Sequence, residues 1–172
     1  MSRRTLAALA ICLMAGTAVS AASREDEAKK YAKDLKSKDA KIRLTAVQEL
    51  GRLGSIQHKL IEPYIDNVVN VLKDTDAKVR GEAARTLGLM DPPEKKEMID
   101  KVAGLLKDEK SEIAREGMEN GLGSLGALAT EPEAKKAALD ALTAAAKNAD
   151  KKEMQAIKAA RALINPPKKK KV

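Results

Sequence analysis

A repeated stretch of 17 residues constrains the fold of this chain more than any other feature. Leu35–Gly51 reads LKSKDAKIRLTAVQELG and Leu72–Gly88 reads LKDTDAKVRGEAARTLG, with nine identical positions at a spacing of 37 residues. A third copy, LKDEKSEIAREGMENGLG at Leu106–Gly123, keeps the register after one inserted residue, and AARAL at Ala159–Leu163 marks a weaker fourth. Periods of about 20 to 50 residues are the signature of stacked repeats. The sequence therefore predicts a solenoid.

Each repeat reads as a pair of helices joined by a polar turn. In the second repeat, apolar residues recur at helical spacing from Ile65 to Leu72, and again from Val79 to Leu87 after the turn. Residues that cap helix N-termini stand where the second helix of each pair begins: Asp39, Asp76, Ser111 and Asp150. Prolines mark the starts of the first helices: Pro63, Pro93 and Pro132. We predict an all-α fold, a solenoid of about four stacked helix pairs.

The composition agrees with thin helical layers. The chain has 172 residues, of which 1% are aromatic, and it contains no Trp and no Phe. A compact single core of this size usually contains large aromatic residues, whereas stacked helix pairs can be packed with Ala, Val, Leu and Ile. We assign residues 22–165 to the repeat domain.

The stretch LKDTDAKVRGEAARTLG resembles the second half of a HEAT repeat, in which an Asp at the turn is followed by Val-Arg, Ala and Leu-Gly. The resemblance implies a right-handed superhelix and a ladder of Asp and Arg residues between adjacent repeats. The ladder positions are Arg43, Asp74, Arg80, Asp108 and Arg115. Ser37 and Ala156 depart from the pattern at the two ends of the array.

The three arginines could instead form a row that binds anions. We favour the ladder, because an arginine in register with the core most simply pairs with a neighbouring acidic turn, whose carboxylate matches the guanidinium fork.

The N-terminus reads as a cleaved secretory signal over residues 1–21. Arg3 and Arg4 precede an apolar run from Leu6 to Val19, which ends in small residues. The run is short for a membrane span, which needs about 20 residues, although an uncleaved anchor is the alternative. The one cysteine, Cys12, lies in this leader. We therefore expect an exported protein, periplasmic or secreted, without disulfides.

The basic charge of the chain is concentrated in a Pro/Lys tail, residues 166–172. Loss of the leader lowers the net charge from +8 to +6, and the tail lysines account for four of these charges: Lys168, Lys169, Lys170 and Lys171. A helical body at +2 without stacking aromatics does not predict specific nucleic-acid binding. The tail is a candidate for weak contact with polyanions. It also resembles a nuclear import signal, which the leader argues against.

No catalytic site or metal site is predicted. His58 is the one histidine, and no nucleophile motif, phosphate loop or calcium loop is present. We expect a protein that is not an enzyme, with no cofactor and no small-molecule substrate. The sequence favours a scaffold that binds a protein partner of unknown identity on its repeats. Tethering to an anionic membrane, envelope polymer or nucleic acid through the tail is one alternative, and a maturation factor for an enzyme is another.

Glycines are concentrated in the second helix of the third repeat, at Gly117, Gly121 and Gly123. Interior glycines lower helix stability, so this helix is predicted to open locally. The alternative is that the glycines allow a neighbouring helix to approach closely.

Overall fold

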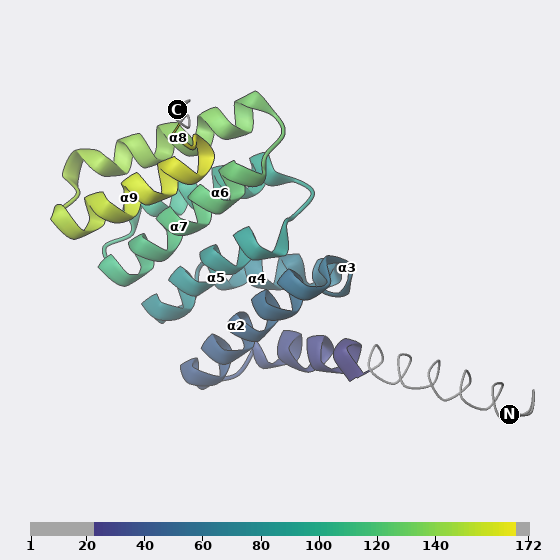
Figure 1. Ribbon diagram of the computed structural model, residues 1–172. Coiled ribbons are helices and arrows are strands. Elements are labelled where there is room, and N and C mark those ends of the chain that lie inside the picture. The colour runs from purple at the N-terminus through teal and green to yellow at the C-terminus, as the bar shows by residue number, and fades with distance from the viewer. Residues whose placement is uncertain (1–22, 168–172) are drawn as a thin grey trace, which may run out of the picture.

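The computed structural model describes residues 23–167 as a stack of helices (Figure 1). Residues 23–34 form the first described helix. It is followed by α2 (Ala40–Ile56), α3 (His58–Ile61), the short 3-10 helix η1 (Glu62–Tyr64), α4 (Ile65–Val71), α5 (Ala77–Met90), α6 (Lys95–Asp108), α7 (Glu112–Leu128), α8 (Pro132–Ala145), the 3-10 helix η2 (Ala146–Asn148) and α9 (Lys151–Ile164). No strand occurs within residues 23–167. The predicted α-solenoid is confirmed.

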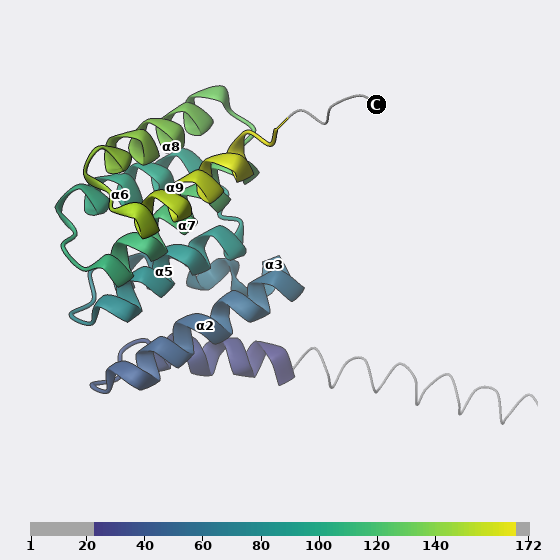
Figure 2. The same cartoon turned by 60° about the vertical axis from the view of Figure 1, so that its left-hand side comes forward.

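The helices form four consecutive pairs that correspond to the four sequence repeats. We call the first helix of each pair the A helix: residues 23–34, α4, α6 and α8. The second members, α2, α5, α7 and α9, are the B helices. Figure 2 shows the B helices stacked in chain order from α2 to α9. Contacts between α2 and α5, α5 and α7, and α7 and α9 confirm that each B helix packs on the next.

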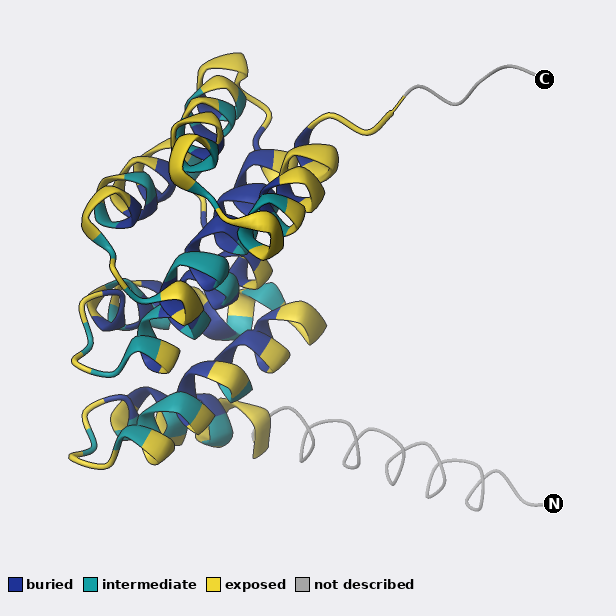
Figure 3. Ribbon diagram, turned by 90° about the vertical axis from the view of Figure 1, so that its left-hand side faces the viewer, coloured by how far each residue is buried: buried dark blue, intermediate teal, exposed yellow. Residues whose placement is uncertain are grey.

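Buried residues run along the whole stack of helices (Figure 3). They form one core cluster, in which small and aliphatic side chains predominate. Leu50, Leu87 and Leu122 occupy corresponding places in three B helices, and each is fully buried. Such burial is worth roughly 1.5 to 3 kcal/mol for each leucine side chain. The repeated leucines of the sequence therefore bury the same face in each repeat.

Glycines set the distance between the B helices. A Cβ atom built on Gly117 of α7 would lie 2.5 Å from the carbonyl carbon of Gly81 in α5, and closer still to its oxygen. A Cβ on Gly121 would lie 2.7 Å from the carbonyl carbon of Ala84, also in α5. On the other side of α7, a Cβ on Gly123 would meet Ala160 of α9 at 2.8 Å. This geometry favours close approach as the reason for the glycines.

The predicted capping residues stand at the N-termini of the B helices. The carboxylate of Asp39 accepts a hydrogen bond from the Lys41 N–H, and Asp76 accepts from the N–H groups of Lys78 and Val79. Asp150 accepts in the same way from Glu153 N–H. Ser111 also holds the N-cap position, but its hydroxyl makes no capping hydrogen bond. Three of the four predicted caps thus bond through their side chains.

Two predicted segments lie outside the described residues, namely the signal peptide at residues 1–21 and the lysines of the tail at residues 168–171. Their boundaries remain predictions. Within residues 23–167, no helix combines the length and apolarity that crossing a bilayer requires.

Candidate functional site

The first step of the arginine ladder joins the first repeat to the second. Arg43 of α2 donates from Nε to Asp74 Oδ2 at 2.6 Å and from Nη2 to Asp74 Oδ1 at 2.7 Å. Its Nη1 donates to the carbonyl oxygens of Ser37 and Lys38 in its own turn. Because the fork is occupied on both sides, the guanidinium clamps one turn onto the next and is not free for an outside anion.

The second step repeats this geometry with a different residue than predicted. Arg80 of α5 donates to Glu109 Oε2 at 2.7 Å and to Oε1 at 2.9 Å, and its Nη1 donates to the Asp74 carbonyl oxygen at 2.8 Å. Asp108 is exposed at the end of α6 and forms no ion pair among the described residues. The prediction of Asp108 was wrong.

The inserted residue in the third turn explains that error. Asp74 stands two residues before the N-cap of its B helix, and Glu109 stands two residues before Ser111. Each carboxylate also accepts the N–H of that N-cap residue, at 2.8 Å for Asp74 and 2.9 Å for Glu109. The carboxylate that pairs with the arginine is therefore the one two residues before the N-cap of the next B helix, whatever its distance from the end of the preceding A helix.

The local electrostatics match this structural role. The side chains of Asp74 and Glu109 are each 8% exposed. Burial raises the pKa of Asp74, but the hydrogen bonds from Arg43 and from the Asp76 N–H outweigh it, so the pKa is lowered. For Glu109 the bonds from Arg80 are the largest influence and lower its pKa against the effect of burial. Both carboxylates stay ionised where they bind their arginines.

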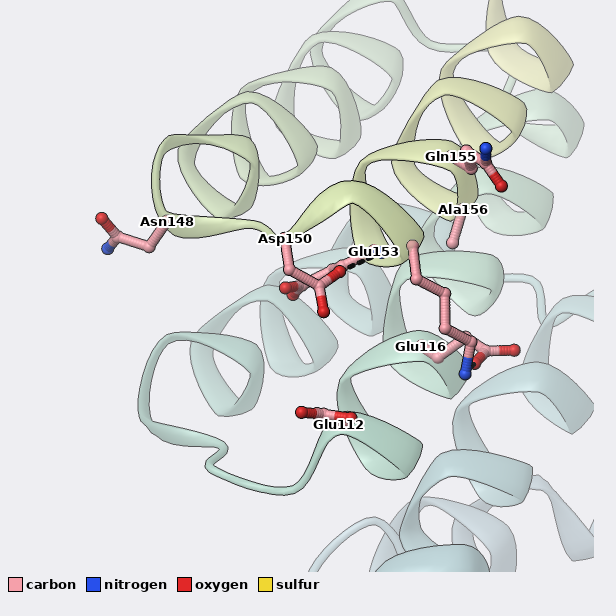
Figure 4. Close-up of a pocket in the computed structure, with 8 residues that line it drawn as sticks. Glu112, Glu116, Asn148, Asp150, Glu153, Gln155 and Ala156 are labelled. Atoms are coloured by element: carbon pink, nitrogen blue, oxygen red, sulfur yellow. Dashed lines mark hydrogen bonds and ion pairs between the residues drawn. The ribbon is translucent and has the colours of Figure 1, made fainter.

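The third step, between the third and fourth repeats, departs from this arrangement. Arg115 of α7 donates from Nε to Glu153 Oε1 at 2.6 Å, and its Nη2 contacts the same oxygen. Glu153 lies in the first turn of α9, not in the preceding turn, where Asn148 stands (Figure 4). The carboxylate thus approaches Arg115 from a helix instead of from a loop.

An open cavity of about 350 Å³ lies at this third step (Figure 4). Its lining residues are Glu112, Glu116, Asn148, Asp150, Lys152, Glu153, Gln155 and Ala156. Four of these residues carry carboxylates and one carries an ammonium group. A second cavity of about 500 Å³ shares three of the lining residues with the first: Glu112, Asn148 and Glu153.

The outer surface of the B helices carries the exposed large aliphatic side chains of the described residues. Six such side chains are between 42% and 56% exposed, and all six lie on B helices: Ile42, Ile56, Leu89, Ile113, Leu128 and Leu163. We call the exposed side of α2, α5, α7 and α9 the B-helix surface. Exposed aliphatic side chains without a function would be scattered over A helices and B helices alike. Their restriction to B helices therefore marks the B-helix surface as a candidate interaction surface.

Four members of this set form a row, which we call the aliphatic row. Each stands in the last turns of its own B helix: Ile56, Leu89, Leu128 and Leu163. They lie 17, 13, 17 and 13 residues after their N-caps, so their positions differ by one helical turn and share one helix face. Neighbouring B helices are in contact near these ends: a Cβ atom built on Gly54 of α2 would lie 3.5 Å from Met90 of α5, and one built on Gly126 of α7 would lie 2.8 Å from Ile164 of α9.

Ion pairs cross the middle of the same surface. Arg85 of α5 lies 3.5 Å from Glu82 on its own helix and 3.2 Å from Glu116 on α7. Glu116 in turn lies 3.3 Å from the Lys152 ammonium group of α9. Exposed pairs of this kind contribute little to stability, so their charges are available to a bound partner.

Metal ligands and histidine were the remaining candidates for a chemical site. Among the described residues, no group of three or more His, Cys, Asp or Glu side chains could hold a metal ion. His58 begins α3 and is half-buried.

Sequence reasoning missed Glu109 and Glu153 as partners of the ladder arginines, and it did not single out Glu119 of α7, which is fully buried. Counting from the N-cap would have identified Glu109, and it would also have placed Glu119 at a position that is apolar in the two preceding repeats. No comparable signal pointed to Glu153.

Stacked helix pairs define an α-solenoid, and here an arginine of α2, α5 and α7 clamps each of these helices to a carboxylate of the following repeat. The HEAT repeats family model matches residues 26–123 and again residues 65–164. The chain belongs to the HEAT-repeat family. Proteins with this fold are typically non-enzymatic scaffolds for protein interaction.

The fold is similar to that of an engineered protein whose crystal structure superposes with a TM-score of 0.59 at 23% sequence identity. The match covers 80% of this chain and 62% of the engineered protein, so the chain spans less than two thirds of that molecule. At this identity the likeness shows the fold alone. Among curated proteins, none matches the sequence.

Proposed function

We propose that this protein is an exported, non-enzymatic scaffold that binds a protein partner on its B-helix surface. The observation that carries the proposal is the placement of all six exposed large aliphatic side chains of the described residues on B helices. Protein interfaces combine an apolar centre with a polar rim. The aliphatic row beside the Arg85, Glu116 and Lys152 ion pairs offers that combination over three neighbouring helices.

Export is proposed from the leader. Arg3 and Arg4 ahead of an apolar run with small residues at its end are typical of a secretory signal. Cleavage after Ala21 produces a chain that begins at Ala22. Mass spectrometry of the protein from its producing cells tests this, because the intact leader on a cytosolic protein would contradict export.

The binding surface can be tested by site-specific cross-linking in the compartment where the protein resides. A photo-activated residue at Leu89 or at Leu128 is expected to capture one reproducible partner protein. The same residue at Lys136, which is exposed on the A helix α8, is expected to capture none. Equal capture from both sides of the solenoid would contradict the assignment of the B-helix surface.

Charged substitutions in the aliphatic row sharpen this test. The double substitution Leu89→Lys and Leu128→Lys places two charges in the aliphatic row, and both side chains are exposed, so folding is expected to be retained. Partner capture is expected to fall at least about tenfold, since two apolar contacts would be lost. The matched control, Thr143→Lys on exposed α8, leaves capture unchanged. Capture that survives the double substitution but disappears in high salt would instead support tethering through the lysine tail.

A further inference from the structure

Glu119 places a carboxyl group in the core of the solenoid. It lies on α7, eight residues after the N-cap Ser111, and its exposed fraction is 0%. The corresponding residues, eight after the N-caps of α2 and α5, are Val47 and Ala84, and both are fully buried. A position that is apolar in the first two repeats is therefore carboxylic in the third.

Both oxygens of the Glu119 carboxyl group are buried, and neither accepts a hydrogen bond from an N–H or O–H group of the described residues, so the group can bind the Glu153 carboxylate only by donating its own proton. It stands four residues after Arg115, on the same face of α7, and the carboxylate of Glu153 approaches it from α9. Arg115 already contacts Oε1 of Glu153 through two nitrogens. Arg115 therefore pairs with Glu153, and it forms no ion pair with Glu119 among the described residues.

Among the described residues, no ion pair joins Glu119 to a lysine or arginine of the helices around α7. From α5, Gly81 and Ala84 face α7, and Arg85 is paired with Glu116, as is Lys152 of α9. Lys107 of α6 and Lys110 of the following turn line the cavity that Arg115 and Glu153 share. The α8 residues at that cavity are Ala141, Ala144 and Ala145, and Glu109 is held by Arg80.

Burial is the main influence on this group, and the adjacent Glu153 carboxylate acts in the same direction. Together they raise the pKa of Glu119 to about 8, against 4.5 for an exposed glutamate, while Arg115 opposes the shift and Glu116 adds to it. In the folded protein Glu119 thus keeps its proton at neutral pH, whereas in an opened chain it ionises.

We propose that the contact between α7 and α9 is a proton-dependent joint: the fourth repeat stays docked while Glu119 carries a proton and detaches when the buried carboxyl group loses it. Within the described residues the fourth repeat packs mainly on α6 and α7 of the third, so α8 and α9 can separate without unfolding the other three repeats. The first two ladder steps have no such group, because Val47 and Ala84 cannot ionise. Detachment would remove Leu163 and Lys152 from the B-helix surface, and that consequence alone rests on the proposed function.

Amide hydrogen exchange of the purified protein between pH 5 and pH 9, corrected for the intrinsic pH dependence of exchange, tests this joint. One proton separates the docked and detached states, so the equilibrium constant for opening α9 is expected to rise tenfold per pH unit from about pH 4.5 to about pH 8. The amides of α2 and α5 are expected to show no comparable trend.

Two substitutions of Glu119 test whether its proton causes the pH dependence of α9 protection. Glu119→Gln keeps the shape and removes the ionisable group, so α9 protection is expected to become independent of pH, and Glu119→Leu provides the same test if the amide is poorly tolerated. The control, Glu112→Gln, changes an exposed carboxylate of the same helix and is expected to retain the pH dependence. If α9 protection in the unsubstituted protein is flat across this range, or if both Glu119 variants keep its slope, the joint does not exist. No partner is needed for these measurements, so they are independent of the proposed function.

Discussion

Replacement of Gly117 by alanine tests how tightly the B helices are packed. Helix propensity alone predicts that an alanine inside α7 is stabilising, by about 0.8 to 1 kcal/mol. The packing predicts the opposite, because the new Cβ would lie 2.5 Å from the carbonyl carbon of Gly81. The atoms it meets belong to the backbone of α5, which cannot move aside by changing a rotamer.

The magnitude follows from the overlap. Carbon atoms pack at about 3.5 to 4 Å, so α7 and α5 must separate by roughly 1 Å, which also loosens the contact of Gly121 with Ala84. Overpacking of this kind costs about 1 to 3 kcal/mol, and here it falls at the upper end because backbone meets backbone. After the gain in helix propensity, we expect Gly117→Ala to lower the free energy of unfolding by about 2 kcal/mol.

Thermal unfolding followed by circular dichroism at 222 nm measures this loss. For a chain of this length, about 2 kcal/mol corresponds to a Tm lower by roughly 4 to 8 °C. The matched control is Gly104→Ala in α6, where a Cβ would meet nothing within 4 Å. That substitution is expected to raise the free energy of unfolding by about 0.8 to 1 kcal/mol.

The stability changes of Gly117→Ala and Gly104→Ala are expected to have opposite signs. If Gly117→Ala stabilises the protein as Gly104→Ala does, then α5 and α7 are not held at the distance described. The glycines of α7 would then be a source of local flexibility, and hydrogen exchange would find the α7 amides less protected than those of α5.

The ladder and the caps give further expectations. Arg80→Met leaves the nearly buried Glu109 without its cation and is expected to cost about 1 to 3 kcal/mol at neutral pH, whereas Lys136→Met, at an exposed ion pair, is expected to change stability by less than about 0.5 kcal/mol. Because Arg80 lowers the pKa of Glu109, the ladder contribution is complete above about pH 4.5 and is lost as the pH falls further, so urea unfolding at pH 3 is expected to show a smaller difference. Asp76→Ala is expected to cost about 1 kcal/mol, while Ser111→Ala, which removes no capping bond, is expected to be nearly neutral in the same urea titrations.

Binding to the B-helix surface and protonation of Glu119 would act on the same part of the molecule. The fourth repeat supplies α9 to that surface, and its attachment to the third repeat includes the one ladder step that differs from the others. A partner that spans α7 and α9 would therefore hold the two repeats together and oppose the opening of the joint, since binding stabilises the state that is bound.

The sequence by itself determined the repeats, the helix pairs and most of the caps. These features depend on interactions between residues a few positions apart: apolar side chains recur once per helical turn, and an Asp before a helix bonds to an N–H two or three residues later. Four copies of the same local pattern at similar intervals were enough to predict the solenoid, although Ser111 could not be recognised as a cap that makes no bond.

The tertiary structure alone decided which groups meet between repeats. Arg80 binds Glu109 instead of Asp108, Arg115 binds a glutamate from α9, and Glu119 is buried where the earlier repeats have Val and Ala. Successive residues of a helix point about 100° apart, so a shift of one position between two stacked helices exchanges one partner for another. That shift depends on how closely the helices approach, which is set by glycines whose neighbours lie about 36 residues away, in a different repeat. A periodic sequence therefore determines what each repeat is, while the packing of one repeat on the next determines which charges are paired and which carboxyl group must keep its proton.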